Sequence, residues 1–122
     1  MRSPARRWAA LAVAVVAIAS SAALASSAEP PYVVTAIDYH FHDAHPTAPI
    51  GPGRDLVVKN ASVGNTHNVT IEAIAFSEDV PPGGQIVIRD IASRFAGPGE
   101  YQLFCRYHRD RGMAGIIVIA SD

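Results

Sequence analysis

The stretch CRYHRDRGM, residues 105–113, contains the only cysteine of a 122-residue chain. His108 follows Cys105 by three residues, and Met113 follows His108 by five. A single thiol cannot form a disulfide within the chain, so Cys105 is a buried small side chain, a reactive nucleophile or a metal ligand. Taken singly, each of the three residues is more often ordinary core or surface. Together they favour a metal site, because thiolate and thioether are soft ligands and imidazole is borderline.

The first 25 residues have the three parts of a secretory signal peptide: a head with three arginines, an apolar run, and small residues that end at Ala25. The apolar run holds about a dozen strongly apolar residues, whereas a membrane-spanning helix needs ~20. We therefore predict residues 1–25 to be a signal peptide rather than a retained membrane anchor, with cleavage after Ala28 as the alternative. The protein is then expected to be periplasmic or secreted, with no membrane span in the mature part.

The expected mature chain, residues 26–122, has the size of one small domain. It carries seven Lys and Arg against eleven Asp and Glu, a formal charge of −4. This balance is not that of a nucleic-acid-binding protein. Because no internal disulfide can form, either the core suffices for stability or a bound metal adds to it. We expect a monomer.

Apolar residues in the mature part alternate instead of recurring at helical spacing, and Gly- and Pro-rich turns separate the alternating segments. About seven short strands in such a chain predict an all-β protein, an antiparallel sandwich or small barrel. The clearest segments are Tyr32–Ile37, Asp55–Lys59, His67–Ile71, Gln85–Ile91, Tyr101–Cys105 and Gly115–Ile119.

Two histidines, one cysteine and a weak axial methionine make up the copper site of electron-transfer proteins. Cys105, His108 and Met113 supply three of these ligands. The fourth must come from elsewhere in the chain. His67 is the natural candidate, because it begins another predicted strand directly after a turn.

Three segments, THNVTIE (66–72), GPGEYQLFCRYH (97–108) and GMAGIIVIA (112–120), resemble those of the cupredoxins, small blue copper proteins of the plastocyanin and pseudoazurin kind. The resemblance covers essentially the whole mature domain. The Cys-x2-His-x4-Met spacing resembles that of plastocyanin and pseudoazurin, not the longer spacing of azurin. The resemblance implies a Greek-key β-sandwich or barrel of about seven to eight strands.

The resemblance also implies one type 1 copper ion that cycles between Cu(II) and Cu(I). Its ligands would be His67, Cys105, His108 and Met113. It further implies that the backbone N–H of Asn68 donates a hydrogen bond to the Cys105 sulfur. Hydrogen bonds of this kind, to an atom that binds the metal, tune the properties of a metal site. One departure is that the family often has a proline near the second histidine, where this chain reads RYHRDR, residues 106–111.

The function implied is the transfer of single electrons between redox partners, with His108 as the point where electrons leave and enter. We expect no enzymatic reaction, because no general base, carboxylate pair or open ligand position stands out. The alternative is a periplasmic copper carrier, buffer or assembly factor that uses the same fold.

The segment HFHDAH, residues 40–45, contains a second group of histidines. In a strand, His40 and His42 share the face opposite Phe41. With His45 they form a candidate site for a second Cu or Zn ion, which would favour the carrier alternative. The competing interpretation is an ordinary polar strand.

Three arginines, Arg106, Arg109 and Arg111, surround His108, and only Asp110 interrupts them. They make a local positive patch on a net acidic domain. We predict that this patch docks a redox partner through carboxylates around the partner's own redox centre. The alternative is a solvated loop in which the arginines pair with Asp110.

Overall fold

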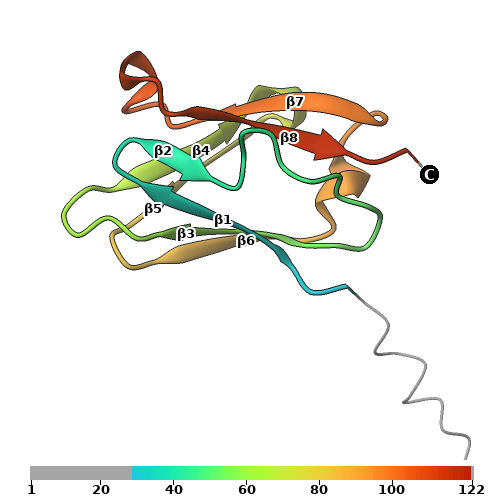
Figure 1. The fold of residues 1–122 in the computed structure, drawn as a ribbon, viewed down its shortest axis with the longest axis horizontal. Coiled ribbons are helices and arrows are strands. Elements are labelled where there is room, and N and C mark those ends of the chain that lie inside the picture. Colours follow the sequence, from blue (N-terminus) through green and yellow to red (C-terminus); the bar gives the residue numbers. More distant parts are fainter. Residues whose placement is uncertain (1–28, 122) are drawn as a thin grey trace, which may run out of the picture.

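The computed structural model describes residues 29–121, which form two four-stranded sheets packed face to face (Figure 1). The all-β sandwich predicted from the sequence is confirmed. The sheets have the strand orders β2-β1-β3-β6 and β5-β4-β7-β8. The strands are β1 Tyr32–Ile37, β2 His40–His42, β3 Leu56–Asn60, β4 His67–Ile71, β5 Phe76–Val80, β6 Gln85–Ile88, β7 Gly99–Phe104 and β8 Ala114–Ile119. Three short 3-10 helices connect them: η1 Glu72–Ile74, η2 Ile91–Arg94 and η3 Arg109–Arg111.

The structure differs from the sequence prediction in three respects. Strand β5 was not predicted, because its central residues are polar and exposed and leave no alternating pattern. The segment predicted to run to Ile91 ends as a strand at Ile88, and Ile91 begins η2. Strands β1 and β3 pair in parallel, with Val34 opposite Val58, whereas the sequence predicted an antiparallel sandwich or small barrel. The predicted signal peptide lies outside the described residues.

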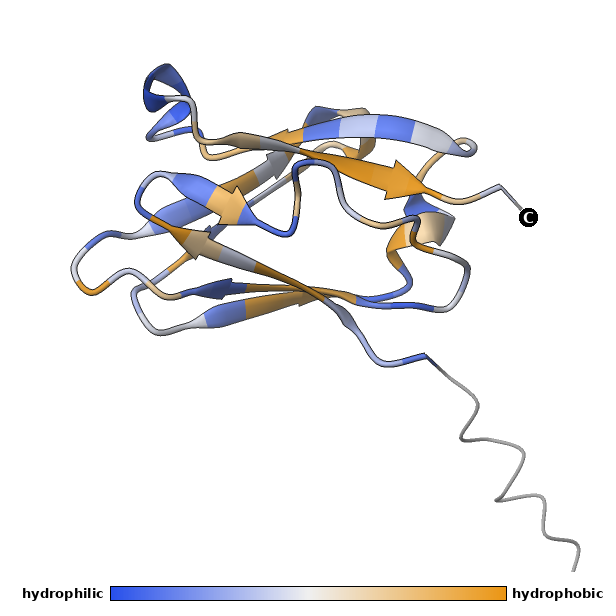
Figure 2. Ribbon diagram, in the orientation of Figure 1, coloured by the Kyte–Doolittle hydropathy of each residue, from blue (hydrophilic) through white to orange (hydrophobic). Residues whose placement is uncertain are grey.

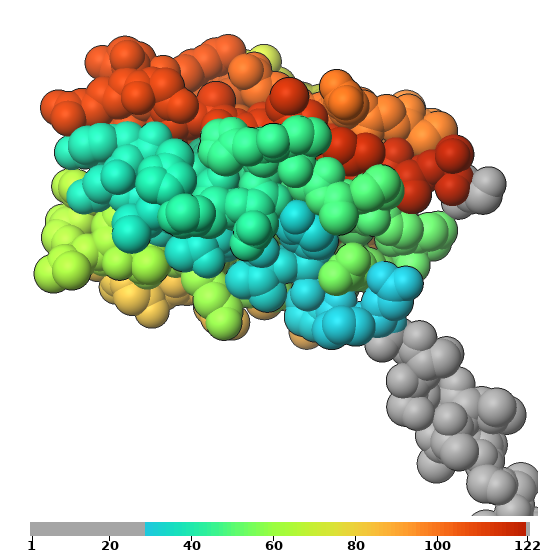
Figure 3. Space-filling view, in the orientation of Figure 1, coloured from blue at the N-terminus to red at the C-terminus, as the bar shows by residue number. Residues whose placement is uncertain are grey.

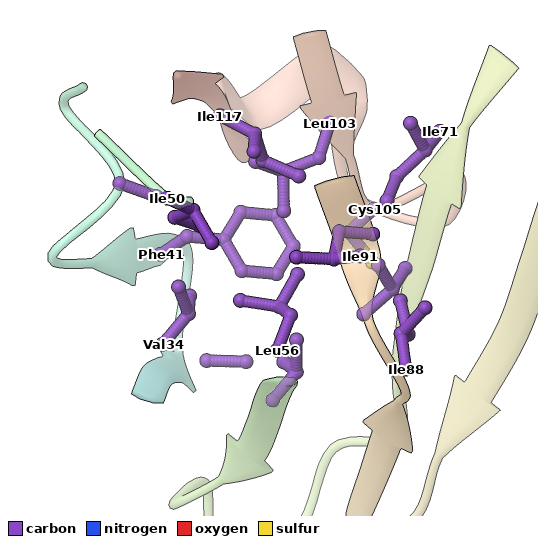
Figure 4. Packing of buried hydrophobic residues seen from close by; sticks show 14 of the residues in the cluster. Val34, Phe41, Ile50, Leu56, Ile71, Ile88, Ile91, Leu103, Cys105 and Ile117 are labelled. Atoms are coloured by element: carbon purple, nitrogen blue, oxygen red, sulfur yellow. The ribbon is translucent and has the colours of Figure 1, made fainter. Parts of the chain in front are cut away.

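The core lies between the sheets, and Phe41 is at its centre (Figure 4). Its ring is fully buried, with Ile117 and Leu103 on one side and Val34 and Leu56 on the other. Alternation along β2 therefore points Phe41 inward and its histidine neighbours outward, as the sequence predicts. In Figure 2, β8 is mostly hydrophobic, β7 carries several hydrophilic residues, and the loop at η3 is hydrophilic.

Three connections meet at one end of the sandwich, the left-hand end in Figure 1. They are the β1–β2 turn, the β3–β4 loop and the β7–β8 loop that contains η3. The C-terminus and residues 29–31 lie at the opposite end. Among the described residues, no helix has the length and apolar character to cross a membrane. The four residues predicted to bind copper lie at these connections: His67 directly follows the β3–β4 loop, and Cys105, His108 and Met113 belong to the β7–β8 loop.

Candidate metal centre

Three side chains converge at this end of the sandwich: His67, Cys105 and His108. Their ligand atoms all lie within 4.8 Å of one another. The two Nδ1 atoms of the histidines are 3.2 Å apart, and the Cys105 Sγ is 3.5 Å from His108 Nδ1. His67 is the first residue of β4, Cys105 follows β7, and His108 precedes η3. The fold therefore brings the start of β4 next to a loop that begins 38 residues further along the chain.

Met113 is held at the same place by the backbone of the β7–β8 loop. The Cys105 N–H donates to the Met113 carbonyl at 3.0 Å, and the Met113 N–H donates to the His108 carbonyl at 3.2 Å. Gly112 allows the chain to return so tightly, because its φ of 81° lies in the left-handed region that favours glycine. Met113, Cys105 and His67 have no exposed surface, while His108 is half-buried.

Asn68 connects the two segments that carry the ligands. Its backbone N–H donates to the Cys105 sulfur at 3.3 Å, the bond that the family resemblance implied. Its side-chain oxygen accepts the Arg106 N–H at 3.3 Å, and its Nδ2 donates to Asp79 at 2.9 Å. The hydrogen bond that Tyr107 donates to Asp79, with that from Asn68, lowers the pKa of the Asp79 carboxyl. Cys105 is therefore fixed by β4 as well as by the β7–β8 loop to which it belongs.

The second ring nitrogen of His67 has partners that the sequence did not indicate. Its Nε2 lies 2.9 Å from Asp38 Oδ1 and 2.7 Å from the Ser62 hydroxyl. Ser62 donates to the same Asp38 oxygen at 2.7 Å, and Asn65 donates to the other at 2.9 Å. The hydrogen bond from Ser62, together with those from Asn65 and His67, lowers the pKa of Asp38. Burial lowers the pKa of His67, and Asp38 opposes this effect in part.

The loop that presents Ser62 and Asn65 is organised by the buried side chain of Asn60. Its Nδ2 donates to the carbonyl oxygens of Asn65 and Val80, each at 2.8 Å, and its Oδ1 accepts the Ser62 N–H at 2.9 Å. Neither Asn60 nor Asp38 gave a signal in the sequence, because the partners of Asp38, and Val80 as a partner of Asn60, lie in other segments. The one feature that could have drawn attention to Asp38 is its position, as an acidic residue directly after a predicted strand.

These donors fit a type 1 copper ion. Two imidazole nitrogens and one thiolate converge, a buried thioether lies beside them, and the sulfur carries an outer hydrogen bond. Among residues 29–121, this is the only group of three or more His, Cys, Asp or Glu side chains close enough to hold a metal ion. A single copper ion is therefore the cofactor that the site accommodates.

The half-buried His108 ring lies against the β1–β2 turn. Its centroid is 4.8 Å from that of Tyr39, and the Arg111 guanidinium stacks over Tyr39 at 4.6 Å. Figure 3 shows the orange-red β7–β8 loop directly above the teal β1–β2 segment at the left-hand end. The ligand loop is thus supported by the turn that also carries Asp38.

The three arginines predicted to dock a partner are all exposed, and they differ in their contacts. Arg106 lies 3.8 Å from the Asp79 carboxylate and contacts the Tyr107 hydroxyl. Arg109 stacks over Phe104 at 4.0 Å, and Arg111 stacks over Tyr39. Within the described part of the chain, neither Arg109 nor Arg111 has a carboxylate within 4.0 Å, so the alternative pairing with Asp110 is not formed.

The second group of histidines is only partly brought together. His40 and His42 lie on the outer face of β2 with their Nε2 atoms 2.9 Å apart. Their ring planes are inclined at 67°, with centroids 4.3 Å apart. His45 is exposed in the following loop, and no third donor from His, Cys or a carboxylate in residues 29–121 joins the pair within 4.8 Å.

Comparison with known proteins identifies the class to which this fold and site belong. Residues 9–119 match the family model of the cupredoxin-like domain. The chain is a member of the cupredoxin family. No match is found among curated proteins.

Solved structures share the fold at low sequence identity. Auracyanin of Roseiflexus castenholzii is 19% identical with a TM-score of 0.58, over 76% of this chain and 98% of that one. Plastocyanin of the fern Dryopteris crassirhizoma is 12% identical with a TM-score of 0.56, over 72% and 99%. A copper-containing nitrite reductase of Thermus scotoductus is 21% identical with a TM-score of 0.59, over 75% of this chain and only 23% of that one. The fold is therefore shared by small copper proteins and by a domain of a larger enzyme.

Proposed function

We propose that this cupredoxin carries single electrons between redox proteins in the periplasm or an equivalent exported space. The observation that supports this most is the convergence of two Nδ1 atoms and one Sγ within 4.8 Å, with Met113 buried beside them. Copper held by this donor set supplies a reversible one-electron couple. The export predicted from residues 1–25 places the protein where such carriers meet their partners.

The chain's own contribution is to hold the ligands still while the charge at the site changes. His67 begins β4 and Cys105 follows β7, which are neighbouring strands of one sheet. Asn68 ties the two segments together through its bonds to Cys105 and Arg106. A ligand set that cannot rearrange keeps the structural change accompanying each transfer small. His108 is the half-buried member of the set, so its ring edge is the route to a partner.

We assign no enzymatic reaction to the protein. The four proposed ligands all come from the chain, which leaves no position on the metal for a substrate. The nitrite reductase to which the fold is similar is a much longer chain, of which this protein matches less than a quarter.

Absorption and electrochemistry of the copper-loaded protein test the proposal. We expect an intense thiolate-to-copper band and reversible one-electron redox in the wild type. Cys105→Ser should lose the band, because a hard oxygen does not replace the thiolate. Cys105→Ala, which has no side-chain donor atom, should behave in the same way and retain the far-ultraviolet signature of the fold.

Two results would contradict the assignment. A strong blue band in Cys105→Ser protein would remove Cys105 from the ligand set. Wild-type protein that binds copper without a blue band, and exchanges it readily, would instead be a copper carrier or buffer.

We further propose that the partner docks at Arg109 and Arg111 through carboxylates around its own redox centre. Both guanidinium groups are exposed beside His108 and, in the described residues, are not neutralised by an acidic neighbour. Arg106 contributes less, because Asp79 lies 3.8 Å from it. Guanidinium is suited to paired contacts with carboxylates, and a patch of one sign accelerates encounter.

A further inference from the structure

Asp38 occupies an unusual position for a carboxylate that is not itself a metal ligand. It lies in the β1–β2 turn, 29 residues before His67. Its Oδ1 contacts Nε2 of the His67 ring, the nitrogen that is turned away from the proposed copper site. Its side chain is 38% exposed, whereas the His67 side chain is fully buried. The buried imidazole of His67 is thus linked through Nε2 to a carboxylate that is partly exposed to solvent.

The hydrogen-bond network determines which ring nitrogen of His67 carries a hydrogen. An ionised carboxylate only accepts, so Ser62 and Asn65 must donate to Asp38. Having used its single hydrogen on Asp38, the Ser62 hydroxyl can only accept from His67. Both partners of Nε2 are therefore acceptors, Nε2 carries the hydrogen, and the Nδ1 lone pair is free to face the copper site.

We propose that Asp38 is a positioning residue for copper: it fixes His67 in the Nε2–H form and strengthens Nδ1 as a donor. The inference rests on the proposed copper site and extends it outward by one residue. A carboxylate behind a ligating imidazole raises the basicity of the ligand, and such partners typically account for about 10–100-fold in metal affinity. A nearby negative charge also favours Cu(II) over Cu(I), so Asp38 lowers the reduction potential.

Asp38→Asn tests the proposal with nearly unchanged volume. The amide has one accepting oxygen where the carboxylate has two, and it lacks the charge. We expect a weaker Cu(II) affinity by roughly 10–100-fold, a higher reduction potential and a retained blue band, because Cys105 is untouched. Asp110→Asn is the matched control: it removes the same charge from exposed η3 in the same loop cluster.

The tautomer of His67 provides a second measurement that needs no copper. Nitrogen-15 spectra of the copper-free wild-type protein should show His67 protonated at Nε2 and bare at Nδ1, and Asp38→Asn should weaken that preference. Finding Nδ1–H in the wild type overturns the inference, as does an Asp38→Asn protein whose affinity and potential match those of Asp110→Asn. If the protein bound no copper at all, the proposed function would fail while the tautomer result stood.

A separate observation concerns His40 and His42 on β2. Two imidazole nitrogens bound to one metal at about 2.0 Å with a right angle between them lie about 2.8 Å apart, whereas a tetrahedral angle separates them by about 3.3 Å. The observed Nε2 to Nε2 distance is 2.9 Å. The two nitrogens are thus close enough to bind one ion, and imidazole nitrogens generally bind Cu(II) more tightly than Zn(II).

We infer that His40 and His42 form a second, exposed Cu(II) site, with water completing the coordination. Strand β2 is at the edge of its sheet, and both side chains point away from the core that Phe41 enters. With only two ligands from the chain, the site should bind copper more weakly than the buried centre and exchange it faster. Its position beside the Tyr39 and Asp38 turn places it at the copper end of the molecule.

Titration with Cu(II) chloride, followed by electron paramagnetic resonance, tests this site. We expect two equivalents in the wild type, the second with the wide hyperfine splitting of tetragonal nitrogen-ligated copper. His40→Ala with His42→Ala should lose only the second equivalent. His45→Ala, the control from the same segment, should keep both, and Zn(II) at equal concentration should compete poorly for the second. A one-to-one titration of the wild type, or equal loss in His45→Ala, overturns the inference and leaves a hydrogen-bonded histidine pair.

Discussion

At the scale of one residue, the side chain of Met113 carries a donor atom that can be exchanged without disturbing its backbone. Its backbone is fixed by hydrogen bonds to Cys105 and His108, so a change of side chain alters the donor atom without moving the loop. It is also fully buried, which would keep water from replacing a weak ligand there. A different side chain at position 113 would therefore present a different donor atom from the same backbone.

Met113→Gln should retain copper, because an axial glutamine oxygen is a known alternative to the thioether. The reduction potential should shift, since a harder oxygen donor favours Cu(II) over Cu(I) and lowers it. Voltammetry of the loaded variant measures the shift, and its blue band should persist because Cys105 is unchanged. Complete loss of copper, or a potential equal to that of the wild type, would place Met113 outside the ligand set.

Strand β8 positions Met113 through its packing on the segment that follows β2. Ala44 accepts the Ile116 N–H at 2.9 Å, and Ile50 donates to Val118 at 2.9 Å. Gly115 makes this approach possible, because a Cβ there would lie 2.6 Å from the Ala44 carbonyl oxygen. Because Gly115 has no side chain, the segment that contains Ala44 can pack against β8 close to the proposed metal centre.

Gly115→Ala should destabilise the protein by about 1–3 kcal/mol, the usual cost of overpacking, because a backbone oxygen must move. Gly64→Ala is the matched control, since a Cβ there meets nothing within 4 Å. Urea unfolding of the two copper-free variants measures the difference. Equal midpoints for the two variants would show that the Ala44 segment yields freely and does not constrain β8.

The net charge of the whole domain and the charge at the proposed docking face have opposite signs. The expected mature chain has a formal charge of −4, yet Arg109 and Arg111 project beside His108. A body of uniform negative potential would repel an anionic partner, whereas a local positive patch would attract it. The sign of the salt effect therefore distinguishes the two descriptions.

Oxidation of the reduced protein by ferricyanide should slow as salt rises, as the Debye length falls from about 30 Å at 0.01 M to about 10 Å at 0.1 M. Arg109→Glu with Arg111→Glu should slow the low-salt rate and leave the absorption spectrum unchanged. Arg89→Glu with Arg94→Glu makes the same charge change in exposed residues away from the η3 loop and should have little effect. A rate that rises with salt in the wild type would mean that the acidic body, and not the patch, governs encounter.

The stability of the copper-free protein should depend on pH through the network behind the site. Burial lowers the pKa of His67 below that in the unfolded chain, near 6.5, so the unfolded state binds more protons below that pH. Stability is then fully present above about pH 6.5 and decreases as the pH falls. Asp38, whose pKa is also lowered, adds a further loss at pH values below about 4.

Thermal unfolding of copper-free protein between pH 7.5 and 5 checks this expectation, given that unfolded His titrates near 6.5. The melting temperature of the wild type should fall across the range, and His67→Asn should remove most of the fall. His45→Ala, at an exposed position, should behave as the wild type does. A melting temperature that is constant or rises toward pH 5 would contradict a lowered pKa for His67.

The sequence by itself predicted the all-β sandwich, which the structure confirms, and it indicated the four residues that we propose as copper ligands. Alternation and turn residues are local signals, and they predicted most strands. Three of the proposed ligands lie within nine residues, and the fourth begins a strand in a recognisable motif. The convergence of His67 with Cys105 and His108 follows once those strands are paired.

Only the tertiary structure decided the parallel pairing of β1 with β3, the strand β5 and the environment behind His67. Strand β5 is polar and exists because β4 offers it an edge, with Val80 opposite His67. Asp38 and Asn60 are ordinary polar residues in the sequence, and each acquires its role from partners brought close by folding. The proposed ligands can be recognised from their residue types and their spacing. The hydrogen bonds that orient them join side chains far apart in sequence. No local pattern indicates which of these side chains will meet.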